Sequence, residues 1–193
     1  MMVAMVAVAL SGCSNNPVGP PSAVTNQFPL TVGSTWTYAV FDSIAQQADT
    51  VTVTALKQTS VSASGATYLW TYRYSNRIDS VTVVSNADTV NYLIPNAALP
   101  RMTFVFPLVA GQSLQGLYYR GSVGAGSASV PAGTFPNSFE VFEQPYEGNF
   151  YGGTTCWIAP HIGIVKEQIQ WLITVSNQRE NTTWQLISYS IAR

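Results

Sequence analysis

Alternation of apolar and polar residues with a period of two runs through most of this 193-residue chain and restricts it to a β-sheet fold. The clearest example is the stretch 66–74, which places Tyr68, Trp70, Tyr72 and Tyr74 on one face of a strand. β-Branched and aromatic residues dominate these stretches, as is typical of strands. We therefore predict strands at residues 34–42, 50–56, 66–74, 79–84, 88–94, 102–107, 117–123, 128–130, 138–144, 154–158, 163–175 and 183–191.

The connections between these stretches are short and carry turn residues such as Ser64-Gly65 and Ser75-Asn76. Short turns join antiparallel neighbours, so the first half of the chain is predicted to be a meander. In the second half, the strand 163–175 is expected to pair with residues 184–191. Helical turns are considered only at 44–48 and 96–99. The predicted fold class is all-β, an antiparallel meander forming a strongly curved sheet or half-barrel with little helix. A β-sandwich and a closed barrel are the alternatives.

The N-terminal segment has a different composition from the rest of the chain. Residues 3–10 are wholly apolar but too few to span a bilayer, which needs about 20 residues. The sequence Leu10-Ser11-Gly12-Cys13 follows, and then residues 14–27, which are rich in Pro, Ser, Asn and Gly. This composition is typical of a flexible tether. We predict a single all-β domain over residues 28–193.

Leu10-Ser11-Gly12-Cys13 resembles the lipobox of a bacterial lipoprotein signal peptide. The resemblance implies that residues 1–12 are removed, that Cys13 is acylated with chains such as palmitate, and that residues 13–27 tether the domain to a membrane. It places the protein in the bacterial cell envelope, on the periplasmic face of the outer membrane or at the cell surface. The alternative is a free apolar tail with an incidental cysteine. No Lys or Arg precedes the apolar run, so we expect the translation start to lie upstream.

Composition excludes several classes of function. Only 9% of the residues are charged, against about 25% in a typical protein. The net charge of -1 provides no basic surface for nucleic acid. If Cys13 is lipidated, no intrachain disulfide can form, and Cys156 is expected to be a small buried hydrophobe. We predict no cofactor.

Three short patterns occur in order along the domain: F-P-L-x-x-G-x-x-W-x-Y from Phe28, V-P-A-G-T-F from Val130 and W-x-A-P-x-x-G-x-V-K from Trp157. As an ordered set they resemble a group of uncharacterised bacterial envelope lipoproteins. That group is similar in shape to the LolA/LolB type of lipoprotein carrier, whose helices plug the concave face of a curved sheet. This chain has no helical segment for such a plug. The resemblance implies no catalytic residues.

Two aromatic regions are candidate ligand or partner surfaces. The row Tyr68, Trp70, Tyr72 and Tyr74 forms core if it faces inward, a ligand groove on an open concave face, or a partner patch if exposed. The second region is the loop 144–153, with Tyr146, Glu147, Phe150 and Tyr151. The nearby Glu140 and Glu143 are predicted to point to opposite faces of a strand, so they do not form a catalytic pair.

The single histidine, His161, gives little support for catalysis or metal binding. A metal site needs several converging ligands, and a nucleophilic site needs a histidine between a nucleophile and an acid. We therefore predict no metal site and no enzyme. An enzyme would instead gather Glu140, Glu147 or Asp42 with His161 in one cleft.

The predicted function is a lipid-anchored, non-enzymatic binding module for an apolar ligand or an envelope protein. A structural or assembly lipoprotein of the outer membrane is the alternative. A fully filled interior would exclude the apolar ligand.

Overall fold

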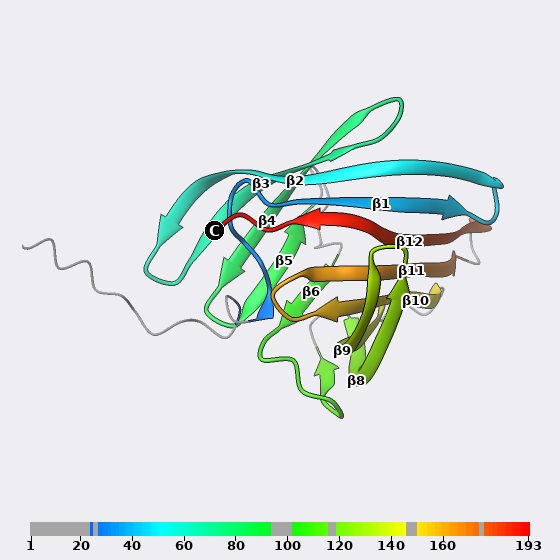
Figure 1. Ribbon diagram of the computed structural model, residues 1–193. Coiled ribbons are helices and arrows are strands. Elements are labelled where there is room, and N and C mark those ends of the chain that lie inside the picture. The colour runs from blue at the N-terminus through cyan, green and yellow to red at the C-terminus, as the bar shows by residue number, and fades with distance from the viewer. Residues whose placement is uncertain (1–23, 25–26, 94–101, 116–118, 146–149, 174–175) are drawn as a thin grey trace, which may run out of the picture.

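Antiparallel strands form one barrel-shaped sheet in the computed structural model (Figure 1), which describes residues 24, 27–93, 102–115, 119–145, 150–173 and 176–193. Over these residues the sheet has twelve strands. They are β1 (Thr35–Asp42), β2 (Gln47–Ser62), β3 (Gly65–Arg73), β4 (Ile78–Asn86), β5 (Thr89–Leu93), β6 (Met102–Val105), β7 (Ser113–Gln115), β8 (Tyr119–Val130), β9 (Gly133–Pro145), β10 (Phe150–Ala159), β11 (Gly163–Ile173) and β12 (Gln178–Ser190).

The sheet is built from two meanders of six strands, in the order β6-β5-β4-β3-β2-β1-β12-β11-β10-β9-β8-β7. The meanders join where the first strand pairs with the last, with Thr35 opposite Ser190. Because β6 and β7 are consecutive in sequence but lie at the two edges, the sheet curves round to leave one seam. The predicted antiparallel, strongly curved sheet with little helix is confirmed, as is the pairing of β11 with β12.

Several strand boundaries differ from the predicted ones. The predicted strands 117–123 and 128–130 are parts of the single strand β8, because glycines interrupt the apolar alternation without ending the pairing with β9. Strand β7 was not predicted, because three residues are too few for a periodic pattern. Strand β2 is longer than predicted because its second half is polar and exposed. The helical turn considered at 44–48 is a turn that leads into β2, and the one at 96–99 lies outside the described residues.

Inward-facing residues of the strands fill the barrel with a continuous hydrophobic core. Trp70 of β3 lies near its centre and is only 3% exposed. Its ring stacks on Trp36 of β1 with centroids 5.0 Å apart, and on Phe28 at 6.4 Å. Such aromatic pairs add to the stabilisation that comes from burial alone. Val24 is also buried in this core.

Two of the three sequence patterns meet in the fold. The indole N–H of Trp36 donates to the carbonyl of Ile162, and the hydroxyl of Tyr38 donates to the carbonyl of Ile164, both at 2.7 Å. These acceptors lie in and just after the β10–β11 turn, where Gly163 has a φ of +93° that only glycine adopts readily. The opening pattern therefore fixes the position of the W-x-A-P-x-x-G-x-V-K turn.

Candidate functional site

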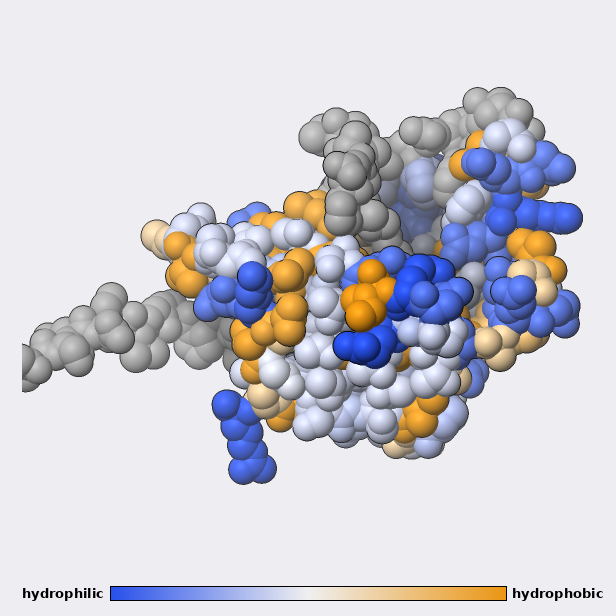
Figure 2. Space-filling model, turned by 90° about the horizontal axis from the view of Figure 1, so that it is seen from above, coloured by the Kyte–Doolittle hydropathy of each residue, from blue (hydrophilic) through white to orange (hydrophobic). Residues whose placement is uncertain are grey.

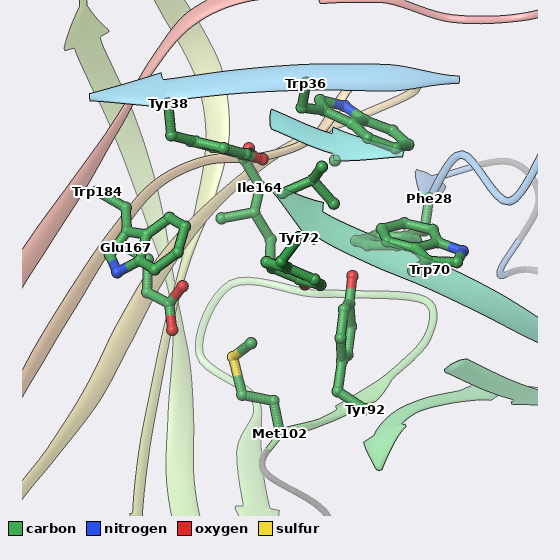
Figure 3. Close-up of a pocket in the computed structure, with 12 residues that line it drawn as sticks. Phe28, Trp36, Tyr38, Trp70, Tyr72, Tyr92, Met102, Ile164, Glu167 and Trp184 are labelled. Carbon is green, nitrogen blue, oxygen red and sulfur yellow. Dashed lines mark hydrogen bonds between the residues drawn. The ribbon is translucent and has the colours of Figure 1, made fainter. Parts of the chain in front are cut away.

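A small cavity inside the barrel is the best-defined candidate site (Figure 3). Its volume of about 20 Å³ provides room for about one water molecule. Figure 3 shows Tyr38 reaching toward Tyr72 from β1, with Tyr92 and Met102 on the opposite side. The walls are mostly aromatic, and they are formed by Phe28, Trp36, Tyr38, Val53, Trp70, Tyr72, Tyr92, Met102, Gly163, Ile164, Glu167 and Trp184.

The predicted aromatic row contributes to this interior. Trp70 and Tyr72 line the cavity, and Tyr68 and Tyr74 are partly buried against the same core. Tyr72 and Tyr74 both pack edge-on against Trp184, with ring centroids 6.4 and 6.2 Å apart. The aromatic row therefore faces the interior of the barrel, which is the first of the three placements considered above.

The predicted loop site is only partly described. Tyr146, Glu147 and the side chain of Phe150 lie outside the described residues, as does Cys13. Tyr151 is in β10 and is 59% exposed. The structure therefore does not bring Tyr151 to the aromatic cavity.

Two carboxyl groups approach the interior from neighbouring parts of the sheet. Glu167 of β11 lies opposite Cys156 of β10 and is only 6% exposed. Glu143 of β9 lies opposite Thr154 of β10. Across the seam, the backbone N–H of Thr103 in β6 donates to Glu143 Oε2 at 3.5 Å. Glu143 Oε1 is buried and has no hydrogen-bond partner in the described part of the chain.

The interior strongly disfavours charge on Glu143. Burial raises the pKa of this carboxyl from 4.5 to about 8, the Thr103 N–H partly offsets the rise, and the charge of Glu167 adds to it. Burial also raises the pKa of Tyr38 and of Tyr92 well above the usual value of 10, with smaller contributions from Tyr72 and Glu167. At neutral pH Glu143 is therefore mostly a neutral acid, which can both donate and accept a hydrogen bond.

The barrel interior also contains hydrogen-bond donors. The indole N–H groups of Trp70 and Trp184 are buried, and neither finds an acceptor among the described residues. Buried donors of this kind are normally satisfied by water or a ligand. The thiol of Cys156 lies 3.5 Å from the sulfur of Met102, which lines the cavity. A small polar group is thus the species whose hydrogen bonds this interior can satisfy.

Sequence reasoning identified only part of this arrangement. Glu140 is exposed and Glu143 reaches inward, so the predicted opposite orientation is confirmed. Glu167 was missed, although its position between Val165 and Ile169 in a period-two strand placed it on the buried face. That alternation was a signal that could have found it.

Two of the residues considered for an enzyme, Asp42 and His161, lie at different ends of the barrel, and a third, Glu147, is outside the described residues. Asp42 ends β1 and accepts hydrogen bonds from the N–H groups of Ile44 and Ala45. His161 lies in the β10–β11 turn, where the neighbouring Ile162 accepts from Trp36 near the start of β1. From Trp36 to Asp42 the strand extends for about 20 Å. Over the described ranges, no three His, Cys, Asp or Glu residues form a group that could hold a metal ion. The same ranges contain no helix with the length and hydropathy needed to cross a membrane.

Comparison with solved structures identifies the fold. A candidate exported protein with a YmcC-like fold from Bacteroides fragilis is 13% identical, with a TM-score of 0.52 over 85% of this chain and 98% of that one. A candidate lipoprotein from Parabacteroides distasonis is 12% identical, with a TM-score of 0.49 over 84% of this chain and 97% of that one. No protein-family model and no curated protein matches the sequence. The chain thus shares its fold with the Bacteroides fragilis protein.

Proposed function

We propose that this protein is a bacterial cell-envelope lipoprotein, anchored by lipid at Cys13 on the periplasmic face of the outer membrane or at the cell surface. The Leu10-Ser11-Gly12-Cys13 sequence supports the anchor, together with the apolar run before it and the Pro-rich segment after it. The fold shared with a candidate exported protein agrees with an envelope location.

The anchor has a direct test. The full chain is expressed in a bacterial host with a labelled palmitate analogue, beside the Cys13→Ser variant. We expect label and membrane fractionation for the natural sequence, and loss of both in the variant. Equal labelling of the two proteins would contradict acylation at Cys13.

Within the envelope, the protein acts as a non-enzymatic binding module. The observation that carries this proposal is the buried, unpartnered oxygen of Glu143 in a barrel interior that is otherwise mostly apolar. Burying an unsatisfied polar group costs free energy, and an apolar side chain of similar size would stabilise this position better. Perturbed titratable groups of this kind are concentrated at functional sites. The part of a ligand that this interior accommodates is one small hydroxyl or amine group, because the cavity has room for about one water molecule.

Native mass spectrometry of the domain purified from its host tests this binding role. The natural sequence is compared with Glu143→Gln, which removes the acidic proton, and with Glu140→Gln, an exposed residue on the same strand. We expect a co-purifying small molecule with the natural sequence and with Glu140→Gln, and its loss with Glu143→Gln. A natural protein that carries no small molecule would refute the apolar-ligand role.

The small cavity volume favours a second function. Only about 20 Å³ is open among the aromatic residues of the cavity, so the described interior leaves little space for a ligand body. A structural or assembly lipoprotein works through its outer surface and needs no larger cavity. Crosslinking in intact envelopes tests this role, and failure to recover a reproducible protein partner would contradict it.

A further inference from the structure

One arm of the sheet extends beyond the barrel. The seven residues at the end of β2, from Leu56 to Ser62, are all exposed, whereas the five residues before them, from Val51 to Ala55, alternate between buried and partly exposed. This segment pairs with the start of β3, where Val61 lies opposite Ala66. Val61 is 71% exposed, more than any other large hydrophobic residue in the described ranges. The arm therefore adds little to the core and presents an apolar residue near its tip.

The arm carries one charge, Lys57 next to its base, and none between there and its tip. No Lys, Arg, Asp or Glu occurs from Gln58 to Tyr72. The β1–β2 hairpin differs, because Asp42 and Asp49 flank its turn. The serine, alanine and valine side chains of the tip can approach lipid head groups without desolvating an ion of their own. The neighbouring β4–β5 turn, whose Ala87 N–H donates to the carbonyl of Ser64 at 2.9 Å, carries the exposed Asp88.

The N-terminal end of the described chain lies beside this arm. The N–H of Gly33 donates to the carbonyl of Ala55 at 2.8 Å, just before the exposed segment begins. In Figure 1 the β2–β3 turn and the C-terminus lie at the same end of the barrel, and Figure 2 shows several hydrophobic groups there. Cys13 precedes the buried Val24 by eleven residues, which span at most about 40 Å.

We infer that the β2–β3 arm rests on the bilayer to which Cys13 is anchored, with Val61 in the head-group region. This inference depends on the lipid anchor proposed above. A single valine binds lipid weakly. The anchor holds the arm near the surface, so the contact acts as a second, intramolecular attachment that needs only weak affinity. The arm then sets the orientation of the barrel on the membrane.

The test uses the full lipidated chain in vesicles of phosphatidylethanolamine and phosphatidylglycerol. An environment-sensitive dye is attached to Val61→Cys or, as the matched control, to Ile44→Cys in the β1–β2 turn. Ile44 is also apolar and 45% exposed, and the native Cys156 is too buried to react in the folded protein. We expect a several-fold rise in dye emission at position 61, quenched by spin-labelled lipid, and no change at position 44.

The possible results separate the arm from the anchor. Flotation with the vesicles reports the anchor independently of the dye. A chain that floats, but whose dye at position 61 is quenched by a water-soluble agent as readily as at position 44, refutes the contact alone. A chain that does not float refutes both the anchor and the inference built on it. Labelling at Ser64→Cys repeats the measurement at the turn without removing the Val61 side chain.

Discussion

Replacing Glu143 by glutamine should change how the stability of the protein depends on pH. In the folded protein the pKa of this carboxyl is about 8, whereas its usual value is 4.5. Below pH 4.5 the carboxyl is protonated in both the folded and the unfolded chain, so its full contribution to stability is present. As the pH rises from 4.5 to about 8, the unfolded chain releases the proton and the folded chain keeps it. The free energy of unfolding therefore falls over this range.

The size of the effect follows from the two pKa values. The difference between 4.5 and about 8 is about 3.5 pH units. At about 1.4 kcal/mol per unit, the loss of stability approaches about 5 kcal/mol as an upper bound. Glu143→Gln removes the titration but keeps the size of the side chain and its ability to accept from Thr103. The variant should therefore gain stability relative to the natural protein as the pH rises.

Urea unfolding followed by the fluorescence of the five tryptophans measures this difference. Titrations from about pH 5 to about pH 9 bracket the range in which Glu143 changes charge. Glu140→Gln serves as the control for removing a carboxyl from the same strand at an exposed position. We expect the curves of Glu143→Gln and the natural protein to diverge by about 2 kcal/mol or more, and those of Glu140→Gln to stay parallel. Parallel curves for all three proteins would refute the argument that Glu143 is buried as a neutral acid.

Three further substitutions, one of them with a control substitution, test the packing of the barrel. Gly152→Ala should destabilise the protein by more than about 2 kcal/mol, because its Cβ would clash with the backbone carbonyl oxygen of Gln170. Gly111 also has a positive φ, but a Cβ there would meet no atom within 4 Å, so Gly111→Ala should cost about 1 kcal/mol. Equal losses in thermal unfolding would show that the clash is absent. Trp70→Ala should cost about 3–5 kcal/mol in urea unfolding, and a loss below about 1 kcal/mol would contradict its place in the core. Tyr38→Phe should cost about 1 kcal/mol through its lost 2.7 Å hydrogen bond, and an unchanged midpoint would argue against that bond.

Local sequence patterns predicted the strands well because burial repeats every two residues. Tyr68, Trp70 and Tyr72 share one face of β3, as their spacing predicted. Short turns correctly predicted antiparallel neighbours within the first meander. The pairing of β1 with β12 joins residues at the two ends of the domain, and no local pattern encodes it. The position of the seam follows from that pairing, so local patterns could not predict it either.

The candidate site was harder to predict than the fold. Glu143 and Glu167 come close only because β9 and β11 both pair with β10, and the register includes a shift between Trp157 and Ile158. Thr103 reaches Glu143 across the seam, between strands that share no backbone ladder. The alternation of apolar and polar residues shows which face of a strand a residue occupies. Whether Glu143, Glu167 and Thr103 come together depends on how β9, β11 and β6 are aligned with one another, and no local pattern encodes that alignment.

The pairing of the first strand, β1, with the last, β12, requires the two ends of the domain to meet during folding. Each meander can assemble from neighbouring hairpins, but the β1–β12 ladder must close a loop spanning nearly the whole domain. Such non-local pairing makes folding slow. Until β12 forms, β1 has an open edge that can pair with other chains. Synthesis of the last dozen residues of the domain is therefore the event that commits the barrel to its final topology.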